Sequence, residues 1–259
     1  MKNTVLITGA CVNTGVAIVE KFASEGYNVI FTGRISENVK AAEQRYRIKF
    51  PETKIIGYTI DSLIDEKNVD EESVRNMFKF IDECGLWVDT LVLNAADQGL
   101  GQKIFENPLT DFIKVMNTNV VWNFCLCEQA AKRMIGAGGG NIIFINSNTA
   151  YRAIPDRIAY VSSKGGQLGL MRALALDLGK YNIRVNAILP GMIKTDRWEK
   201  NPEFYANVPS RFTPIGDVAL GCDVADAVWY FAAHARNTTG AELVVDGGNT
   251  IQLYPIIKQ

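Results

Sequence analysis

The sequence carries almost no net charge and contains no long apolar run. Lysine and arginine number 27 against 28 aspartate and glutamate, a formal net charge of −1. That balance offers no basic surface to nucleic acid or to an anionic membrane, so we expect neither as a partner. No stretch approaches the about 18 consecutive apolar residues of a membrane span. The N-terminus MKNTVLITGA also lacks the apolar segment and cleavage site of a signal peptide, and we expect a cytoplasmic protein.

Cysteine and histidine are too few and too scattered for a disulfide framework or a zinc site. The sequence has one histidine, His234, and an odd number of cysteines, which we expect to be reduced thiols. Two of these cysteines lie two residues apart in a helical segment and therefore face different sides. The sequence thus predicts no metal site. The five cysteines are Cys11, Cys84, Cys125, Cys127 and Cys222.

Short β-branched runs alternate with longer amphipathic stretches, and no Pro-, Ser- or Gly-rich linker divides the 259 residues. The alternation predicts a single α/β domain with a Rossmann-type, doubly wound fold, in which helices cover both faces of a seven-stranded parallel sheet. Residues 192–213 show no clear periodicity, and we expect a substrate lid there. Strands are expected at 4–8, 28–32, 54–60, 90–93, 141–145, 184–188 and 242–245, and helices at 16–24, 37–50, 71–84, 110–135 and 158–181.

The segment TGACVNTG follows the apolar run Val5-Leu6-Ile7 and predicts a turn that binds phosphate. Three glycines usually make such a turn tight and let the backbone approach a pyrophosphate. Gly9 and Gly15 supply the first and the last, and Asn13 stands in the middle position. Asparagine tolerates a positive φ, and its amide donates hydrogen bonds. The helix N-terminus from Thr14 offers further N–H groups to an anion, so we expect the turn to bind a nucleotide.

The segment AYVSSK places two proton-exchanging groups on one face of a predicted helix. Tyr160 and Lys164 are four residues apart, which brings their side chains together one turn apart. A free tyrosine titrates near ~10, and a nearby cation lowers that pKa toward the range of general acid–base catalysis. Taken alone, the pair fits a chance surface contact better than a catalytic one.

The remaining motifs remove that ambiguity. Ser147 follows a predicted strand, and Asn119 lies in NTNVVWN. Taken in chain order, the set resembles the short-chain dehydrogenase/reductase superfamily over essentially the whole chain. The resemblance rests on the glycine turn TGACVNTG, the strand-four segment LNAA, the catalytic segments INS, YVSSK and RVNAILPG, and the C-terminal segments TPIGDVALGCDVADAVWYFAA and TGAELVVDGG.

The resemblance implies an oxidoreductase that transfers a hydride between a nicotinamide cofactor and a small carbonyl compound or secondary alcohol. It makes Tyr160 the general acid/base and Ser147 the donor that holds the substrate oxygen. Lys164 would bind the nicotinamide ribose and depress the tyrosine pKa. Asn119 would position a water that relays protons toward solvent.

The same resemblance implies a cofactor-binding set. Asn94 would brace the central strands, although Ala96 stands where the family usually has glycine. Asp61 resembles the acid that contacts adenine, and it fits a helix N-cap as well. Ile193 and Thr195 resemble the residues that hold the nicotinamide carboxamide. The full set is Gly9, Asn13, Thr14, Gly15, Arg34, Asp61, Asn94, Tyr160, Lys164, Ile193 and Thr195.

Gly33-Arg34 after the second strand predicts NADP(H) as the preferred cofactor. NAD-specific sites usually place a carboxylate at this strand end, where it accepts hydrogen bonds from the ribose 2′-hydroxyl. Gly33 stands in that position, and the Arg34 guanidinium suits a 2′-phosphate. Arg34 is alternatively a solvated charge at the start of the next helix, and NAD(H) stays possible.

Two other function classes fit part of the sequence. A hydrolase would use Ser147 as nucleophile and His234 as its base, but no GxSxG elbow surrounds Ser147. A nucleotide-binding regulatory protein without turnover is consistent with Asn13 and Ala96, which depart from the family pattern. Because the four candidate catalytic side chains are all present, we favour the enzyme.

Substrate recognition and assembly are less closely defined. Aromatic residues suited to an apolar or stacking pocket are Trp198, Phe204, Tyr205 and Phe212, and basic residues suited to an anion are Arg197, Lys200 and Arg211. The resemblance implies a homo-oligomer, a tetramer or a dimer, with contacts on the helices at 110–135 and 158–181. Candidate contact residues, which fit an ordinary core equally well, are Val120, Val121, Phe124, Leu168, Leu170, Met171 and Leu174.

Overall fold

The computed structural model describes residues 3–101, 103–106 and 109–255, without the side chains at 197, 199, 204 and 210. Seven parallel strands form one sheet in the order β3-β2-β1-β4-β5-β6-β7, which confirms the predicted fold class. The strands are β1 (Thr4–Ile7), β2 (Asn28–Gly33), β3 (Ile55–Thr59), β4 (Val88–Leu93), β5 (Gly140–Ile145), β6 (Ile183–Pro190) and β7 (Glu242–Val245).

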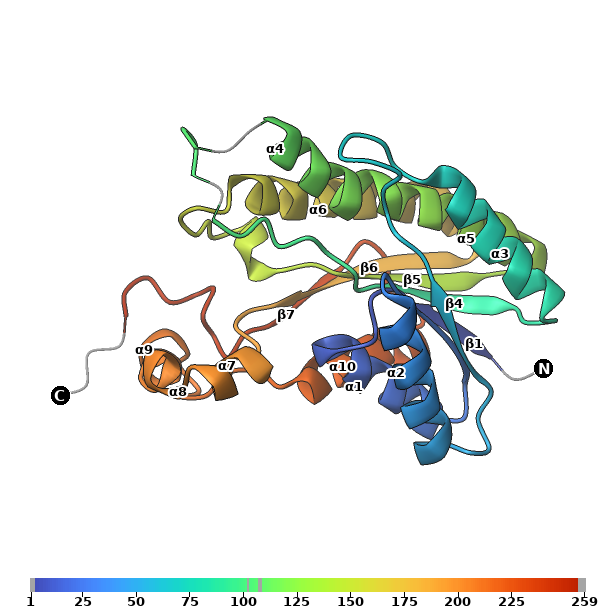
Figure 1. Cartoon of the computed structure of the whole chain (residues 1–259), viewed down its shortest axis with the longest axis horizontal. Coiled ribbons are helices and arrows are strands. Elements are labelled where there is room, and N and C mark those ends of the chain that lie inside the picture. The colour runs from blue at the N-terminus through green and yellow to red at the C-terminus, as the bar shows by residue number, and fades with distance from the viewer. Residues whose placement is uncertain (1–2, 102, 107–108, 256–259) are drawn as a thin grey trace.

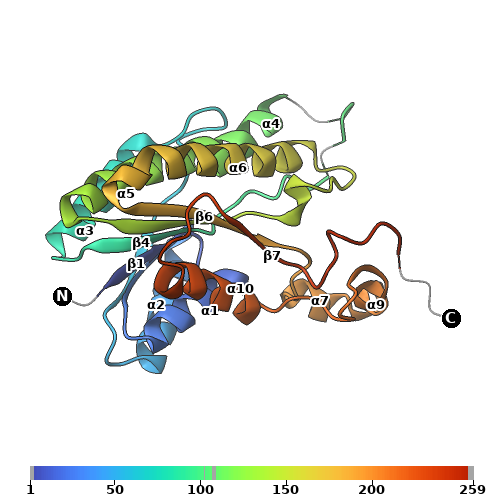
Figure 2. The same ribbon diagram turned by 180° about the vertical axis from the view of Figure 1, so that it is seen from behind.

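Helices cover both faces of the sheet (Figures 1 and 2). One layer holds α1 (Asn13–Ser24), α2 (Ser36–Lys49) and α10 (Gly221–Trp229), and the other holds α3 (Glu71–Glu83), α4 (Leu109–Met116), α5 (Trp122–Ala137) and α6 (Ile158–Leu178). Val5 and Ile7 of β1 pack into the first layer and Leu6 into the second. Because side chains alternate along a strand, a strand covered on both faces is apolar throughout.

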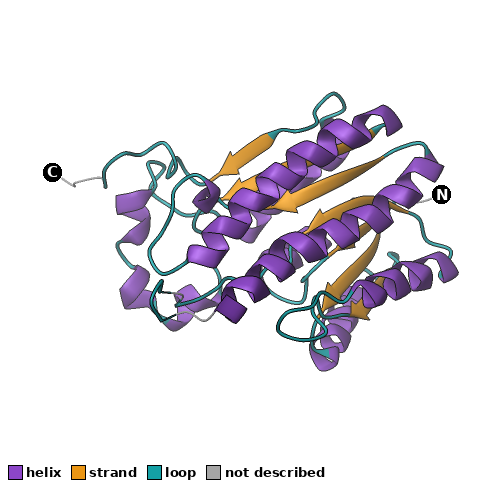
Figure 3. Ribbon diagram, turned by 90° about the horizontal axis from the view of Figure 1, so that it is seen from above, coloured by secondary structure: helices purple, strands orange, loops and turns teal. Residues whose placement is uncertain are grey.

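The predicted helix at 110–135 is interrupted. A π-helical turn at Asn117–Val121 separates α4 from α5, and such turns are frequent at functional sites. The predicted lid contains three short helices, α7 (Asp196–Lys200), α8 (Pro202–Tyr205) and α9 (Val208–Phe212). Figure 3 shows the strand arrows pointing toward the side of the molecule that carries these helices.

The candidate oligomer contacts divide between the core and the surface. Leu168 and Met171 of α6 are buried within the chain, because they pack against the sheet. These two residues are therefore core residues and not surface contacts. Val121 and Phe124 are 43% and 49% exposed, and they remain candidate contacts.

The described residues contain no helix long and apolar enough to cross a membrane. They also contain no group of three or more His, Cys, Asp or Glu side chains placed to hold a metal ion. All five cysteines are free thiols.

Candidate active site

A large cavity lies at the carboxyl ends of the strands. Its volume is about 1140 Å³, more than the about 300–1,000 Å³ typical of a pocket for one drug-sized ligand. This volume leaves room for a dinucleotide and a small substrate together. All the predicted site residues except Asn119 line it: Gly9, Asn13, Thr14, Gly15, Arg34, Asp61, Asn94, Ser147, Tyr160, Lys164, Ile193 and Thr195.

The turn between β1 and α1 is packed too closely for side chains at its two glycines. Gly9 has φ +64°, and a Cβ there would lie 2.9 Å from the Cα of Ala95. A Cβ at Gly15 would lie 2.6 Å from the Cα of Ala10. Asn13 has φ +52° and begins α1, in the left-handed region that asparagine tolerates. The turn thus keeps its compact form with asparagine in the middle position.

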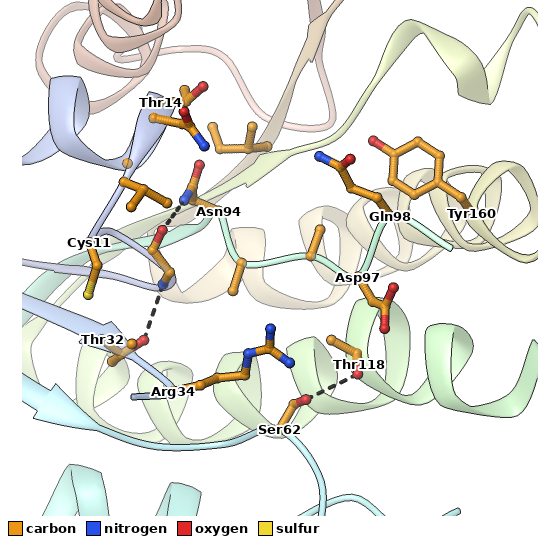
Figure 4. A pocket seen from close by; sticks show the side chains of 18 of the residues that line it. Cys11, Thr14, Thr32, Arg34, Ser62, Asn94, Asp97, Gln98, Thr118 and Tyr160 are labelled. Carbon is orange, nitrogen blue, oxygen red and sulfur yellow. Dashed lines mark hydrogen bonds between the residues drawn. The ribbon is translucent and has the colours of Figure 1, made fainter. Parts of the chain in front are cut away.

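Two neighbouring side chains brace this turn. The Asn94 amide donates to the carbonyl oxygens of Thr8 and Gly9 at 3.0 and 2.9 Å, which ties the end of β4 to the turn (Figure 4). The Tyr46 hydroxyl donates to the Ala10 carbonyl at 2.6 Å, and burial raises the pKa of Tyr46 to about 12. Both contacts hold the backbone in place whether or not a ligand is bound.

Tyr160, Ser147 and Lys164 converge in the pocket. Tyr160 and Lys164 lie in the first two turns of α6, with the Lys164 Nζ 5.5 Å from the centroid of the Tyr160 ring. Ser147 follows β5. Burial raises the pKa of Tyr160, and the Ser147 hydroxyl and the Arg157 charge oppose that rise.

This direction differs from the depressed tyrosine pKa that the resemblance implies. Burial also lowers the pKa of Lys164 to about 7, because a low-dielectric interior disfavours charge. This lowering favours the neutral amine, which affects the pKa of Tyr160 less than an ammonium does.

Asn119 lies in the π-helical turn, buried behind the pocket. Its side-chain amide accepts from the Asp97 N–H and donates to the Asp97 carbonyl, both at 2.8 Å, and it donates to Ser163 Oγ at 2.9 Å. Ser163 Oγ in turn donates to the Tyr160 carbonyl at 2.8 Å. Asn119 therefore connects the loop after β4 with the helix that carries Tyr160.

The opposite end of the pocket holds Arg34 and Asp61. Figure 4 shows the Arg34 side chain reaching toward Ser62 and Thr118. A Cβ at Gly33 would lie 2.5 Å from the Cys11 Sγ, so a side chain at this position would require Cys11 to move. The N-cap alternative for Asp61 is wrong, because α3 begins at Glu71 and its cap is Asp70.

Sequence reasoning missed two pocket residues in the loop after β4. Asp97 and Gln98 line the pocket, and in Figure 4 the Gln98 amide points toward the Tyr160 hydroxyl. Their signal was present in the sequence, because both directly follow the strand end that carries Asn94. Asn38, Lys114 and Thr118 also line the pocket, and no simple pattern distinguishes them from surface residues.

The segment predicted as a lid supplies part of the expected aromatic lining. Trp198 and Tyr205 line the pocket and stack with ring centroids 4.4 Å apart, and Lys200 lines it too. Phe212 and Arg211 are not among the lining residues, and the Arg211 guanidinium lies over the Phe212 ring. The side chains of Arg197 and Phe204 lie outside the described part of the chain.

His234 does not serve the hydrolase alternative. It is exposed in the π-helical turn after α10, where its ring meets the edge of Trp229, and it is not among the residues that line the pocket. The histidine therefore cannot act as base to Ser147 in this arrangement.

Comparison with known proteins assigns the family. Residues 9–250 match the family model described as enoyl-(acyl carrier protein) reductase. An uncharacterized oxidoreductase of Thermotoga maritima is 32% identical over 255 residues, 96% of each chain. The chain belongs to the short-chain dehydrogenase/reductase family, and it is an oxidoreductase.

Two solved structures of similar proteins contain different cofactors. ElxO with NADP bound is 30% identical with a TM-score of 0.85, covering 97% of this chain and 100% of its own. NAD⁺-bound xylitol dehydrogenase is 28% identical with a TM-score of 0.82, covering 95% of this chain and 98% of its own. A nicotinamide cofactor is consistent with both.

Proposed function

We propose that this oxidoreductase transfers a hydride between NADP(H) and a small carbonyl compound or secondary alcohol, with Tyr160 as the general acid/base. The observation that carries the proposal is the convergence of Tyr160, Ser147 and Lys164 in a pocket whose volume of about 1140 Å³ suits a dinucleotide together with a substrate.

Tyr160 would hold and move the proton. In reduction its hydroxyl gives a proton to the carbonyl oxygen, and in oxidation its phenolate takes that proton back. Ser147 would donate a hydrogen bond to the same oxygen. The burial that raises the pKa of Tyr160 keeps the phenol protonated at neutral pH, which is the form that reduction requires.

The remaining predicted residues would hold and orient the reactants. When bound, the cofactor supplies or accepts the hydride. Lys164 would hold the nicotinamide ribose, and Ile193 and Thr195 the carboxamide. Asn119 would support this centre from behind through its bonds to Asp97 and Ser163.

The pocket supports the cofactor at its other end as well. The packed glycine turn and the first N–H groups of α1 would bind the pyrophosphate, with Asn13 donating beside Gly9 and Gly15. Asp61 would contact the adenine. The Arg34 guanidinium would bind the 2′-phosphate of NADP(H), and Gly33 carries no carboxylate that would repel this phosphate.

The direct test replaces the Tyr160 hydroxyl and leaves the ring in place. The protein is assayed for loss of NADPH absorbance against a panel of ketones, hydroxyketones and ketoses, with NADH in parallel. We expect Tyr160→Phe to lower kcat by at least the ~10²-fold typical of losing general acid–base catalysis, with little change in NADPH affinity. Tyr181→Phe, at an exposed tyrosine beyond α6, is the matched control. Near-normal turnover in Tyr160→Phe would refute the mechanism.

A further inference from the structure

Gln167 is a buried polar side chain that belongs neither to the predicted catalytic set nor to the pocket lining. It lies on α6 one turn after Lys164 and is 1% exposed. Its Nε2 donates to the Asn119 carbonyl at 2.7 Å. Its Oε1 accepts from the Lys164 Nζ and from the Asn146 Nδ2, both at 3.1 Å. One amide thus connects three residues of the active centre.

The partners of the Gln167 amide determine its orientation. The Asn119 carbonyl can only accept, so the NH₂ group faces it, and the Lys164 ammonium can only donate, so the oxygen faces it. Asn146 is fixed in the same way, because its Oδ1 accepts from the Ser147 N–H at 2.7 Å and its Nδ2 also donates to the Lys164 carbonyl at 2.9 Å. The network has a single consistent arrangement of donors and acceptors.

The Asn119 carbonyl already accepts two side-chain hydrogen bonds. It accepts from the Gln167 Nε2 at 2.7 Å and from the Asn123 Nδ2 at 2.9 Å, which uses both lone pairs of a carbonyl oxygen. The Asn119 side chain is likewise engaged through its bonds to Asp97 and Ser163.

The Lys164 ammonium is held on its interior side. It donates to the Ile145 carbonyl at 2.9 Å and to the Gln167 Oε1 at 3.1 Å, which leaves one of its three N–H groups for the pocket that Lys164 lines. The titratable group facing it is Tyr160, on its own helix. The groups that β5, the segment after it and the π-helical turn present are uncharged carbonyls and amides.

We propose that Gln167 is a positioning residue of the active centre, whose amide holds the Lys164 ammonium beside Tyr160 and occupies the interior position at Asn119 expected for a relay water. A carboxamide does not release a proton at neutral pH, so proton exchange between Tyr160 and solvent runs through the pocket. The catalytic part of this inference rests on the proposed function. The effect on Lys164 rests on the geometry of the network alone.

The test measures the titration of Lys164 in the cofactor-free protein. Side-chain NMR of ¹³C-labelled lysine follows the Lys164 signal, which is assigned by its absence in Lys164→Met. The titration is measured in the unmodified protein, in Gln167→Met and in Gln167→Glu. Gln167→Met should lower the titration midpoint by about one pH unit, because the lost hydrogen bond favours the ammonium form. Gln167→Glu should raise it, since a carboxylate adds a negative charge. Gln44→Met, exposed on α2, should leave it unchanged.

The pH dependence of kcat provides the second readout. The kinetic pKa assigned to Lys164 should fall in Gln167→Met and rise in Gln167→Glu. Loss of packing alone does not produce opposite shifts. Should Gln167→Met fail to fold, the upward shift in Gln167→Glu carries the test. Midpoints that stay in place, or that move the same way in both variants, would overturn the inference. Opposite midpoint shifts in a protein that oxidises no NADPH would overturn the proposed function instead.

Discussion

We propose that cofactor choice depends on Arg34. It lines the pocket beside Gly33, which brings no carboxylate to the end of β2. A carboxylate at that strand end would accept from the ribose 2′-hydroxyl and repel a 2′-phosphate. With Gly33 at that strand end the repulsion is absent, and the Arg34 guanidinium adds attraction.

We expect the unmodified protein to prefer NADPH over NADH by at least tenfold in kcat/KM, about 1.4 kcal/mol. Arg34→Ala should abolish most of that difference by raising the KM for NADPH, because the phosphate loses its charged partner. Steady-state kinetics with both cofactors measures it. Lys40→Ala, an exposed basic residue on α2 outside this pocket, is the control. Equal efficiency with the two cofactors in the unmodified protein would show that Arg34 does not recognise the phosphate.

At the scale of elements, the turn between β1 and α1 carries the closest backbone packing in the site. Gly9 and Gly85 have nearly the same φ, +64° and +66°. A Cβ at Gly9 would lie 2.9 Å from the Ala95 Cα, whereas a Cβ at Gly85 meets nothing within 4 Å. Alanine substitutions at the two positions therefore distinguish the free-energy cost of a left-handed backbone from the cost of close packing.

We expect Gly85→Ala to lower the free energy of unfolding by about 1–2 kcal/mol, the strain of a left-handed alanine. Gly9→Ala should lose a further about 1–3 kcal/mol from overpacking and should also weaken NADPH binding, because the turn must shift. Urea unfolding and a fluorescence titration with NADPH measure the two effects. Equal losses of stability with unchanged NADPH affinity would contradict the role given to this turn.

The central strands were predictable because they are covered on both faces and so appear as short β-branched runs. The edge strand β7 was predicted at its observed bounds, although Val244 is 41% exposed. The interruption of the helix at 117–121 was not predictable from local sequence, since a π-helical turn depends on how Asn119 bonds to Asp97 across the fold. The helix α10 was not assigned as an element of its own, although its sequence lies in a segment used for the family resemblance.

The residues of the candidate site also divide into those that local sequence predicted and those that it did not. Residues that follow strands or form short motifs, such as Tyr160 and Ser147, were found from local sequence. Gln167 was missed because two of its three partners, Asn119 and Asn146, lie 48 and 21 residues away in the chain, and a glutamine on a helix usually faces solvent. The position of Gln98 in the pocket lining was also missed, although Asn94 at the end of the preceding strand was among the predicted residues.

At the scale of the whole molecule, α5 and α6 expose apolar side chains beyond those that the sheet covers. Phe124 is 49% and Leu176 83% exposed. We expect these helices to pair with those of a second copy in a homotetramer or homodimer.

Light scattering at micromolar concentration should give two or four times the 28.6 kDa chain mass. Phe124→Asp should lower that mass, because a carboxylate is costly in an apolar interface. Phe105→Asp, at a 97% exposed phenylalanine outside both helices, should not change it. A monomeric unmodified protein would refute the assembly.

The central claim, hydride transfer controlled by Tyr160, is tested most directly by following the hydride itself. NADPH carrying deuterium at the transferable C4 position is incubated with the protein and the best substrate of the carbonyl panel, and the product is analysed by mass spectrometry and NMR. We expect the deuterium on the carbon that bears the new hydroxyl, with the same label formed at least ~10²-fold more slowly by Tyr160→Phe. A product without deuterium at that carbon, or labelling at the normal rate in Tyr160→Phe, would contradict the account.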